Sequence, residues 1–102
     1  MMNKARIAII GAGLSGLYAT YLLEKQGIDY VLLEARDRIG GRIHSVAADG
    51  QSVMDIKATS DCFDLGPSWF WPGYQPQLGQ LVEELGLKSF AQFEDGDMVI
   101  ER

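Results

Sequence analysis

The sequence predicts an α/β fold of the Rossmann-like type, a parallel sheet whose strands are joined by a helix. Two runs rich in isoleucine, valine and leucine, 5–10 and 28–34, are typical of strands in a parallel sheet. Between them lies a stretch with the apolar spacing of a helix, and a G-x-G-x-x-G string lies where the first run ends. Together these segments span about 30 residues, the length of one strand–helix–strand unit.

Three glycines, Gly11, Gly13 and Gly16, follow the first strand. In such a loop the first glycine allows a tight turn, the second lets a pyrophosphate approach the backbone, and the third lets the helix pack close to the strand. The free N–H groups at the start of the helix would then meet the phosphates. By itself the spacing is weak support for a dinucleotide site, because glycine-rich strings also occur by chance.

The first helix is expected from the glycine loop to about Gln26, with Gly27 ending it. Its apolar stripe consists of Leu14, Leu17, Tyr18, Tyr21 and Leu22. The second strand ends at Glu34, which lies 18 residues after Gly16. A carboxylate there can accept hydrogen bonds from the ribose hydroxyls of an adenosine, and it would repel the 2′-phosphate of NADP. The alternative is an ordinary solvated acid at the end of a strand.

A basic segment follows, in which Arg36, Arg38 and Arg42 surround the pair Gly40-Gly41. Arginine binds phosphate bidentately or stacks on adenine, and a glycine pair permits a second close backbone approach. A basic surface turn is the other interpretation of this segment taken alone.

The rest of the chain predicts smaller elements. Short strands are expected at 43–46, 53–56 and 62–65, with a turn at Asp49-Gly50 and a loop over 57–61. The aromatic cluster 69–71 is either core or the wall of a ligand pocket. A second amphipathic helix is expected over 77–85, ending at Gly86, and a β-hairpin is expected from 90–93 and 98–100 around the turn 94–97.

Composition narrows the classes of function. The chain has 102 residues, enough for one domain, and is 47% hydrophobic and 23% charged, as a globular protein is. Its net charge of −5 argues against nucleic acid as a partner. The single cysteine, Cys62, cannot form a disulfide within the chain, which favours a reducing, cytoplasmic location. One histidine, His44, and scattered acids indicate no metal site, and the uncharged run 7–23 holds three glycines and is not expected to span a membrane.

Four blocks, 9–17, 31–36, 38–42 and 64–69, together with the helical stretch 81–87, resemble in order and spacing the N-terminal part of the flavin-containing amine oxidase family. That family includes monoamine, polyamine and L-amino-acid oxidases. The resemblance implies a Rossmann-like FAD-binding βαβ unit with additional short strands. It also implies an oxidoreductase in which FAD takes a hydride from a C–N bond and oxygen is the acceptor.

The resemblance also implies the FAD-binding residues. The glycine loop would face the pyrophosphate and Glu34 the adenosine ribose. The adenine and diphosphate side would be lined by Arg36, Gly41 and Arg42, and the segment 66–69 would approach the flavin end. The set is Gly11, Gly13, Leu14, Ser15, Gly16, Glu34, Ala35, Arg36, Gly41, Arg42, Gly66, Pro67, Ser68 and Trp69. The chain departs from the family at Pro67, often glycine, and at Trp71, often a small residue, and its segment 50–63 is longer than usual.

Members of that family run to several hundred residues, and their substrate domain, catalytic lysine and aromatic cage come from later sequence. Residues 1–102 are therefore expected to be the N-terminal part of an FAD/NAD(P)-binding domain, with no catalytic residue assignable and no turnover of an amine substrate without the rest. The alternative is a short chain that completes its fold with a partner or a second copy.

Three other functions stay open beside the amine oxidase reading. One is a flavoprotein acting on another bond, such as an FAD-dependent desaturase, and another is a non-catalytic nucleotide-binding or interaction module. An NAD dehydrogenase is least favoured, because the block Gly40-Gly41-Arg42 is typical of FAD-binding proteins.

Overall fold

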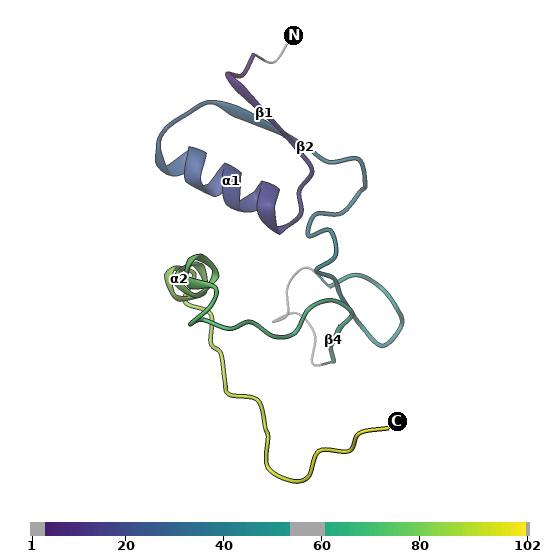
Figure 1. The fold of residues 1–102 in the computed structure, drawn as a ribbon. Helices are drawn as coiled ribbons and strands as arrows, with labels where there is room; N and C mark the ends of the chain where they lie inside the picture. Colours follow the sequence, from purple (N-terminus) through teal and green to yellow (C-terminus); the bar gives the residue numbers. More distant parts are fainter. Residues whose placement is uncertain (1–3, 54–60, 102) are drawn as a thin grey trace. The chain divides into compact units, whose positions relative to one another are not determined.

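The computed structural model describes residues 4–53 and 61–101. Its first elements are β1 (Ile7–Ile10), α1 (Leu14–Lys25) and β2 (Tyr30–Leu33), which form the strand–helix–strand unit that the sequence predicts. The two strands are parallel, with Ile7 opposite Tyr30 and Ile10 opposite Leu33. Figure 1 shows α1 running alongside the two strands it connects. The parallel Rossmann-like unit is thus confirmed.

Helix α1 begins directly after Gly13, includes Gly16, and ends where the sequence predicts. Gly27 has a φ of +66°, a conformation that L-residues with a side chain rarely adopt. Its N–H donates to the carbonyl of Glu24 (3.1 Å), and the Ile28 N–H donates to that of Leu23 (3.0 Å). These bonds engage carbonyls of the last helical turn, and they turn the chain toward β2.

A second, antiparallel pair joins β3 (Ser45–Val46) to β4 (Phe63–Asp64). The strands predicted at 43–46 and 62–65 are therefore confirmed over shorter ranges. The turn at Asp49-Gly50 is also confirmed, because the Gly50 N–H donates to the carbonyl of Ala47 (2.9 Å) and the φ of Gly50 is +84°. The strand expected at 53–56 and the loop expected at 57–61 lie almost wholly outside the described residues.

The two strands of the main sheet are more exposed than the sequence predicts. A parallel strand that is apolar throughout is expected to be buried on both faces. Here Ile10 is 77% exposed and Leu33 is 50% exposed, whereas Ala12, within the glycine loop, is buried. The physical reason is that, among the described helices and strands, α1 alone packs extensively against this sheet. Most of the apolar surface of β1 and β2 is therefore not covered by another described element.

The chain divides into two compact units, Met1–Ser68 and Trp69–Arg102. The second contains α2 (Pro76–Glu84), which the sequence predicts to within one residue at each end. Gly86 ends it at a φ of +67°, as expected. The predicted hairpin is wrong, since residues 87–101 contain no strand. Phe90 and Val99 are 95% and 92% exposed, and an isolated two-stranded hairpin without a covered apolar face is marginal in water.

Candidate functional site

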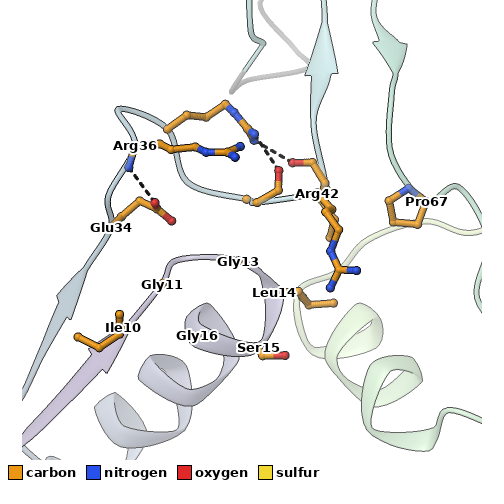
Figure 2. A pocket seen from close by; sticks show the side chains of 14 residues that line it. Ile10, Gly11, Gly13, Leu14, Ser15, Gly16, Glu34, Arg36, Arg42 and Pro67 are labelled. Atoms are coloured by element: carbon orange, nitrogen blue, oxygen red, sulfur yellow. Dashed lines mark hydrogen bonds between the residues drawn. The ribbon is translucent and has the colours of Figure 1, made fainter.

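A pocket of about 860 Å³ opens in the first unit, where β1 and β2 end and α1 begins. Figure 2 shows side chains from the glycine loop, from the end of β2 and from the basic segment around it. The lining consists of Ile10, Gly11, Gly13, Leu14, Ser15, Gly16, Glu34, Arg36, Arg38, Gly40, Gly41, Arg42, Ile43 and Pro67. In open α/β sheets, ligands bind at this edge, outside the carboxyl ends of the strands.

The three glycines of the first loop have distinct geometries. Gly11 has a φ of +98°, and its N–H donates to the carbonyl of Leu33 (2.7 Å), so it turns the chain while staying tied to β2. A Cβ on Gly16 would collide with the carbonyl oxygen of Gly11, so this position excludes any side chain. A Cβ on Gly13 would meet no atom within 4 Å, and its φ of −78° suits any residue. Space beside Gly13 is thus left clear on the pocket side for a ligand.

The start of α1 is suited to a negative group. Gly13 is its N-cap and offers no side chain to cap the first turn, which also contains no acid. The first backbone N–H groups of a helix have no partner within the helix, and the helix dipole makes this end positive. A phosphate beside Gly13 would satisfy these donors.

The glycine pair Gly40-Gly41 is hydrogen-bonded to the first glycine loop. The Gly40 N–H donates to the carbonyl of Ala12 (2.7 Å), and a Cβ on Gly41 would lie 3.3 Å from the Cα of Gly13. Gly40 and Gly41 have φ values of +102° and +61°. Only glycine adopts such a turn readily, so the pair brings the basic segment's backbone against the first glycine loop.

Glu34 joins the same two loops through its carboxylate. Oε1 accepts from the Ala12 N–H (3.0 Å) and Oε2 accepts from the Arg36 N–H (2.9 Å), the second of which is drawn in Figure 2. The hydrogen bond from Arg36, followed by that from Ala12, holds the pKa of Glu34 below its ordinary value of 4.5. Each carboxylate oxygen keeps a further lone pair, so the ionised group can also accept a hydroxyl from a ligand.

The three arginines of the basic segment all line the pocket, but they are not equivalent. Arg36 and Arg42 are exposed. Arg38 is half-buried, and its guanidinium donates to three backbone carbonyls. With Glu34 as the acid among the lining residues, the pocket has an excess of positive charge, as a diphosphate site requires.

Most of the residues that the sequence predicts for the site lie together in this pocket; Ala35, Gly66, Ser68 and Trp69 are not among its lining residues. Gly66 packs tightly on the backbone of Arg42, where a Cβ would collide with the carbonyl oxygen. The Ser68 hydroxyl donates to Asp64 (3.2 Å). Trp69 begins the second unit and is 64% exposed, so its place at the flavin end stays a prediction.

Four lining residues were not predicted from the sequence: Ile10, Arg38, Gly40 and Ile43. Arg38 and Gly40 belong to the block 38–42, so its spacing could have identified them. Ile10 and Ile43 are apolar residues at or near strand ends, and no chemical signal distinguishes them from core.

Neither a metal site nor a membrane-spanning helix occurs in residues 4–53 and 61–101 of the protein. No group of three histidine, cysteine, aspartate or glutamate side chains there could hold a metal ion. Neither α1 nor α2, the helices in residues 4–53 and 61–101, is long and apolar enough to cross a membrane.

A parallel βαβ unit with an uncapped helix start, a glycine cradle and an acid after β2 defines the class of dinucleotide-binding Rossmann-like domains. Residues 9–85 match the model of the family described as "NAD(P)-binding Rossmann-like domain". The chain belongs to this family.

Relatives with curated descriptions confirm the resemblance to flavin-containing amine oxidases. "Probable flavin-containing monoamine oxidase A" of Dictyostelium discoideum is 39% identical over 95 residues, 93% of this chain and 18% of that protein. "Protoporphyrinogen oxidase 2, chloroplastic/mitochondrial" of Arabidopsis thaliana is 34% identical over 92 residues, 90% of this chain and 16% of that protein. Each match therefore spans less than a fifth of the relative's length.

A solved structure shows the same arrangement. A triple mutant of putrescine oxidase superposes with a TM-score of 0.72 at 38% sequence identity, covering 90% of this chain and 18% of that chain. The Rossmann-like fold class predicted from the sequence is thereby confirmed, and it corresponds to one part of the longer putrescine oxidase fold.

Proposed function

We propose that this chain is the FAD-binding portion of an amine oxidase-like flavin oxidoreductase. The observation that carries the proposal is the clear space beside Gly13, next to the uncapped start of α1 and under the second glycine pair. The similarity to flavin-containing amine oxidases supports FAD over NAD as the dinucleotide. The carboxylate of Glu34 supports a ribose with a free 2′-hydroxyl, since a 2′-phosphate would meet its negative charge.

Each part of the pocket has a role in this proposal. The first turn of α1, with Gly13, Leu14 and Ser15, holds the diphosphate through backbone N–H groups. Glu34 accepts the ribose hydroxyls while its bonds to the two loops keep it ionised and fixed. Arg42 adds a positive side chain near the diphosphate.

When bound, FAD supplies a hydride acceptor for the oxidation of a C–N bond, and oxygen reoxidises it. The residues of this chain bind and orient the adenosine and diphosphate. No catalytic residue is assigned within the chain, and an amine-type substrate is part of the proposal only for the longer enzyme that its relatives represent.

A second candidate is a flavoprotein of the same construction that oxidises another bond, as a desaturase does. The similarity to a protoporphyrinogen oxidase favours this alternative, since one cofactor pocket then serves unlike substrates. A nucleotide-binding module without chemistry is the third. The same proposal includes a reducing, cytoplasmic location, which the single cysteine, Cys62, supports. It also includes completion of the fold by further chain or by a second copy.

A Gly13→Val substitution tests the cofactor site. The φ and surroundings of Gly13 accept a side chain, so the variant should fold, while the added atoms occupy the space proposed for the diphosphate. We expect FAD uptake, measured by flavin fluorescence after gel filtration, to fall at least about tenfold, as the loss of one or two charge-assisted hydrogen bonds does. The matched control is Gly73→Val, since Gly73 also has open space and no positive φ. Equal uptake by the Gly13 variant and the control would sink the proposal.

A further inference from the structure

The guanidinium of Arg38 is surrounded by backbone carbonyls of its own segment. Nη1 donates to the carbonyl of Ile39 (3.1 Å) and to that of Ile43 (3.2 Å). Nη2 donates to the carbonyl of Gly41 (2.7 Å). A guanidinium has five N–H donors in one plane, and here three hydrogen bonds engage it with the turn rather than with a ligand.

These carbonyls belong to the turn that closes over the phosphate loop. Gly40 lies within it, with a φ of +102° and its N–H donated to Ala12. The Ile43 N–H donates to the carbonyl of Gly40 (3.0 Å), and a Cβ on Gly40 would lie 3.4 Å from Nη1 of Arg38. The side chain therefore packs directly against the glycine whose N–H joins the two loops.

The charge of Arg38 has a clear partner in this arrangement. Three converging carbonyl oxygens place partial negative charges close together, and a nearby diphosphate would be repelled by them if nothing neutralised them. A guanidinium bonded to all three offsets this repulsion, and charge-assisted hydrogen bonds are stronger than neutral ones.

We propose that Arg38 is a positioning residue, which holds the Gly40-Gly41 turn closed over the phosphate loop and does not itself bind phosphate. Arg36 and Arg42 are then the arginines of the segment that remain for the ligand. This role of Arg38 rests on the proposed function where FAD binding is measured, whereas the state of the turn can be measured without FAD.

The first test follows amide hydrogen exchange in the free 102-residue chain by NMR. In Arg38→Gln, the amides of Gly40 and Ile43 should exchange about tenfold faster or more, because their turn loses its charged hydrogen bonds. The exchange rates of the α1 amides should not change in Arg38→Gln. In the control Arg6→Gln, which removes an exposed arginine outside the pocket, the exchange rates of Gly40, Ile43 and the α1 amides should all match those of the parent. Unchanged exchange at Gly40 and Ile43 would overturn the inference.

Arg38→Lys keeps the test decisive if Arg38→Gln fails to fold. An ammonium has its donors on one nitrogen and cannot serve Gly41 and Ile43 from two separate positions as the guanidinium does. The exchange rate of the Gly40 amide in Arg38→Lys should therefore lie between the rates of the parent and of Arg38→Gln. If only the lysine variant folds, its rate should still be faster than that of the parent. A lysine variant with parent-like exchange contradicts a geometric role for the guanidinium.

The second test measures the Kd of FAD against salt concentration by flavin fluorescence. Arg38→Gln should raise the Kd about tenfold through the loosened turn, with no greater loss of salt dependence than Arg6→Gln shows. Arg42→Gln should lower the salt dependence. A large loss of salt dependence in Arg38→Gln would show direct phosphate contact and overturn the inference. If the parent chain takes up no FAD, the proposed function fails, and the exchange result still decides the role of Arg38.

Discussion

Glu34 does two things at once in the site. It joins the glycine loop to the basic segment through the N–H groups of Ala12 and Arg36, and it lines the pocket. The bonding is specific to the ionised carboxylate, which accepts at both oxygens, whereas a protonated carboxyl would present a hydrogen to one of them. In the proposed site, the same bonds keep Glu34 charged toward a ribose and tie it to the loops proposed to hold the phosphates.

A pH-dependent contribution to stability follows from this bonding. The pKa of Glu34 is lower in the folded chain than its ordinary value of 4.5, so folding favours the ionised form. Its contribution is fully present above pH 4.5 and is lost as the pH falls through the lowered pKa of the folded state. Glu34→Gln should therefore be less stable than the parent at pH 7, and the difference in unfolding free energy should shrink below pH 4.5.

Urea unfolding followed by circular dichroism at pH 7 and at pH 3 measures this difference. The control is Glu94→Gln, which removes an exposed carboxylate in the second unit and should change stability little at either pH. A difference between parent and Glu34→Gln that is the same at both pH values would contradict the assigned role.

At the scale of the elements, sequence reasoning succeeds where local chemistry decides the conformation. Gly27 and Gly86 end their helices at positive φ, and the apolar periodicity places α1 and α2 within a residue or two. The positions of the first glycine loop and of Glu34 in the pocket were predictable too, because strand ends of a parallel unit meet at one edge.

The features that sequence reasoning missed depend on tertiary contacts. The segments 90–93 and 98–100 are largely apolar and flank a turn-like stretch, but no described residue covers their apolar side chains, so no ladder forms. Arg38 looks like one more phosphate-binding arginine in the sequence. Only the path of the backbone, which brings three carbonyls to its guanidinium, separates it from Arg36 and Arg42.

A substitution at the end of α1 tests the local rule. Gly27 has a φ of +66°, and a Cβ there would meet no atom within 4 Å, so an alanine would suffer from the left-handed backbone alone. Gly27→Ala should lower the free energy of unfolding by about 1–2 kcal/mol. The measurement is urea unfolding, with Gly73→Ala as the control at an open position without positive φ. Equal stability of the two variants would show that α1 does not end in the way described.

Across the residues that the structure describes, the chain has little buried core and much exposed apolar surface. Ala12 and Val46 are buried, whereas Ile10, Phe63 and Leu65 are 77%, 55% and 65% exposed. The solved relatives extend far beyond the matched region, which is 18% of the putrescine oxidase chain. For a unit with so small a core, a bound ligand that joins several loops is expected to contribute a large share of the stability.

FAD should therefore stabilise this chain measurably, and the effect should be linked to its affinity. A ligand that binds only the folded state adds about 2.7 kcal/mol when its concentration is 100 times the Kd. Titrating FAD during thermal unfolding should raise the midpoint steadily with the logarithm of the FAD concentration, and the slope should give the same Kd as fluorescence. NADP, whose 2′-phosphate would meet Glu34, should shift the midpoint far less. Both ligands would place a diphosphate at the start of α1. Equal shifts of the midpoint from FAD and NADP would therefore mean that the pocket recognises the diphosphate alone and that Glu34 does not discriminate between the two riboses.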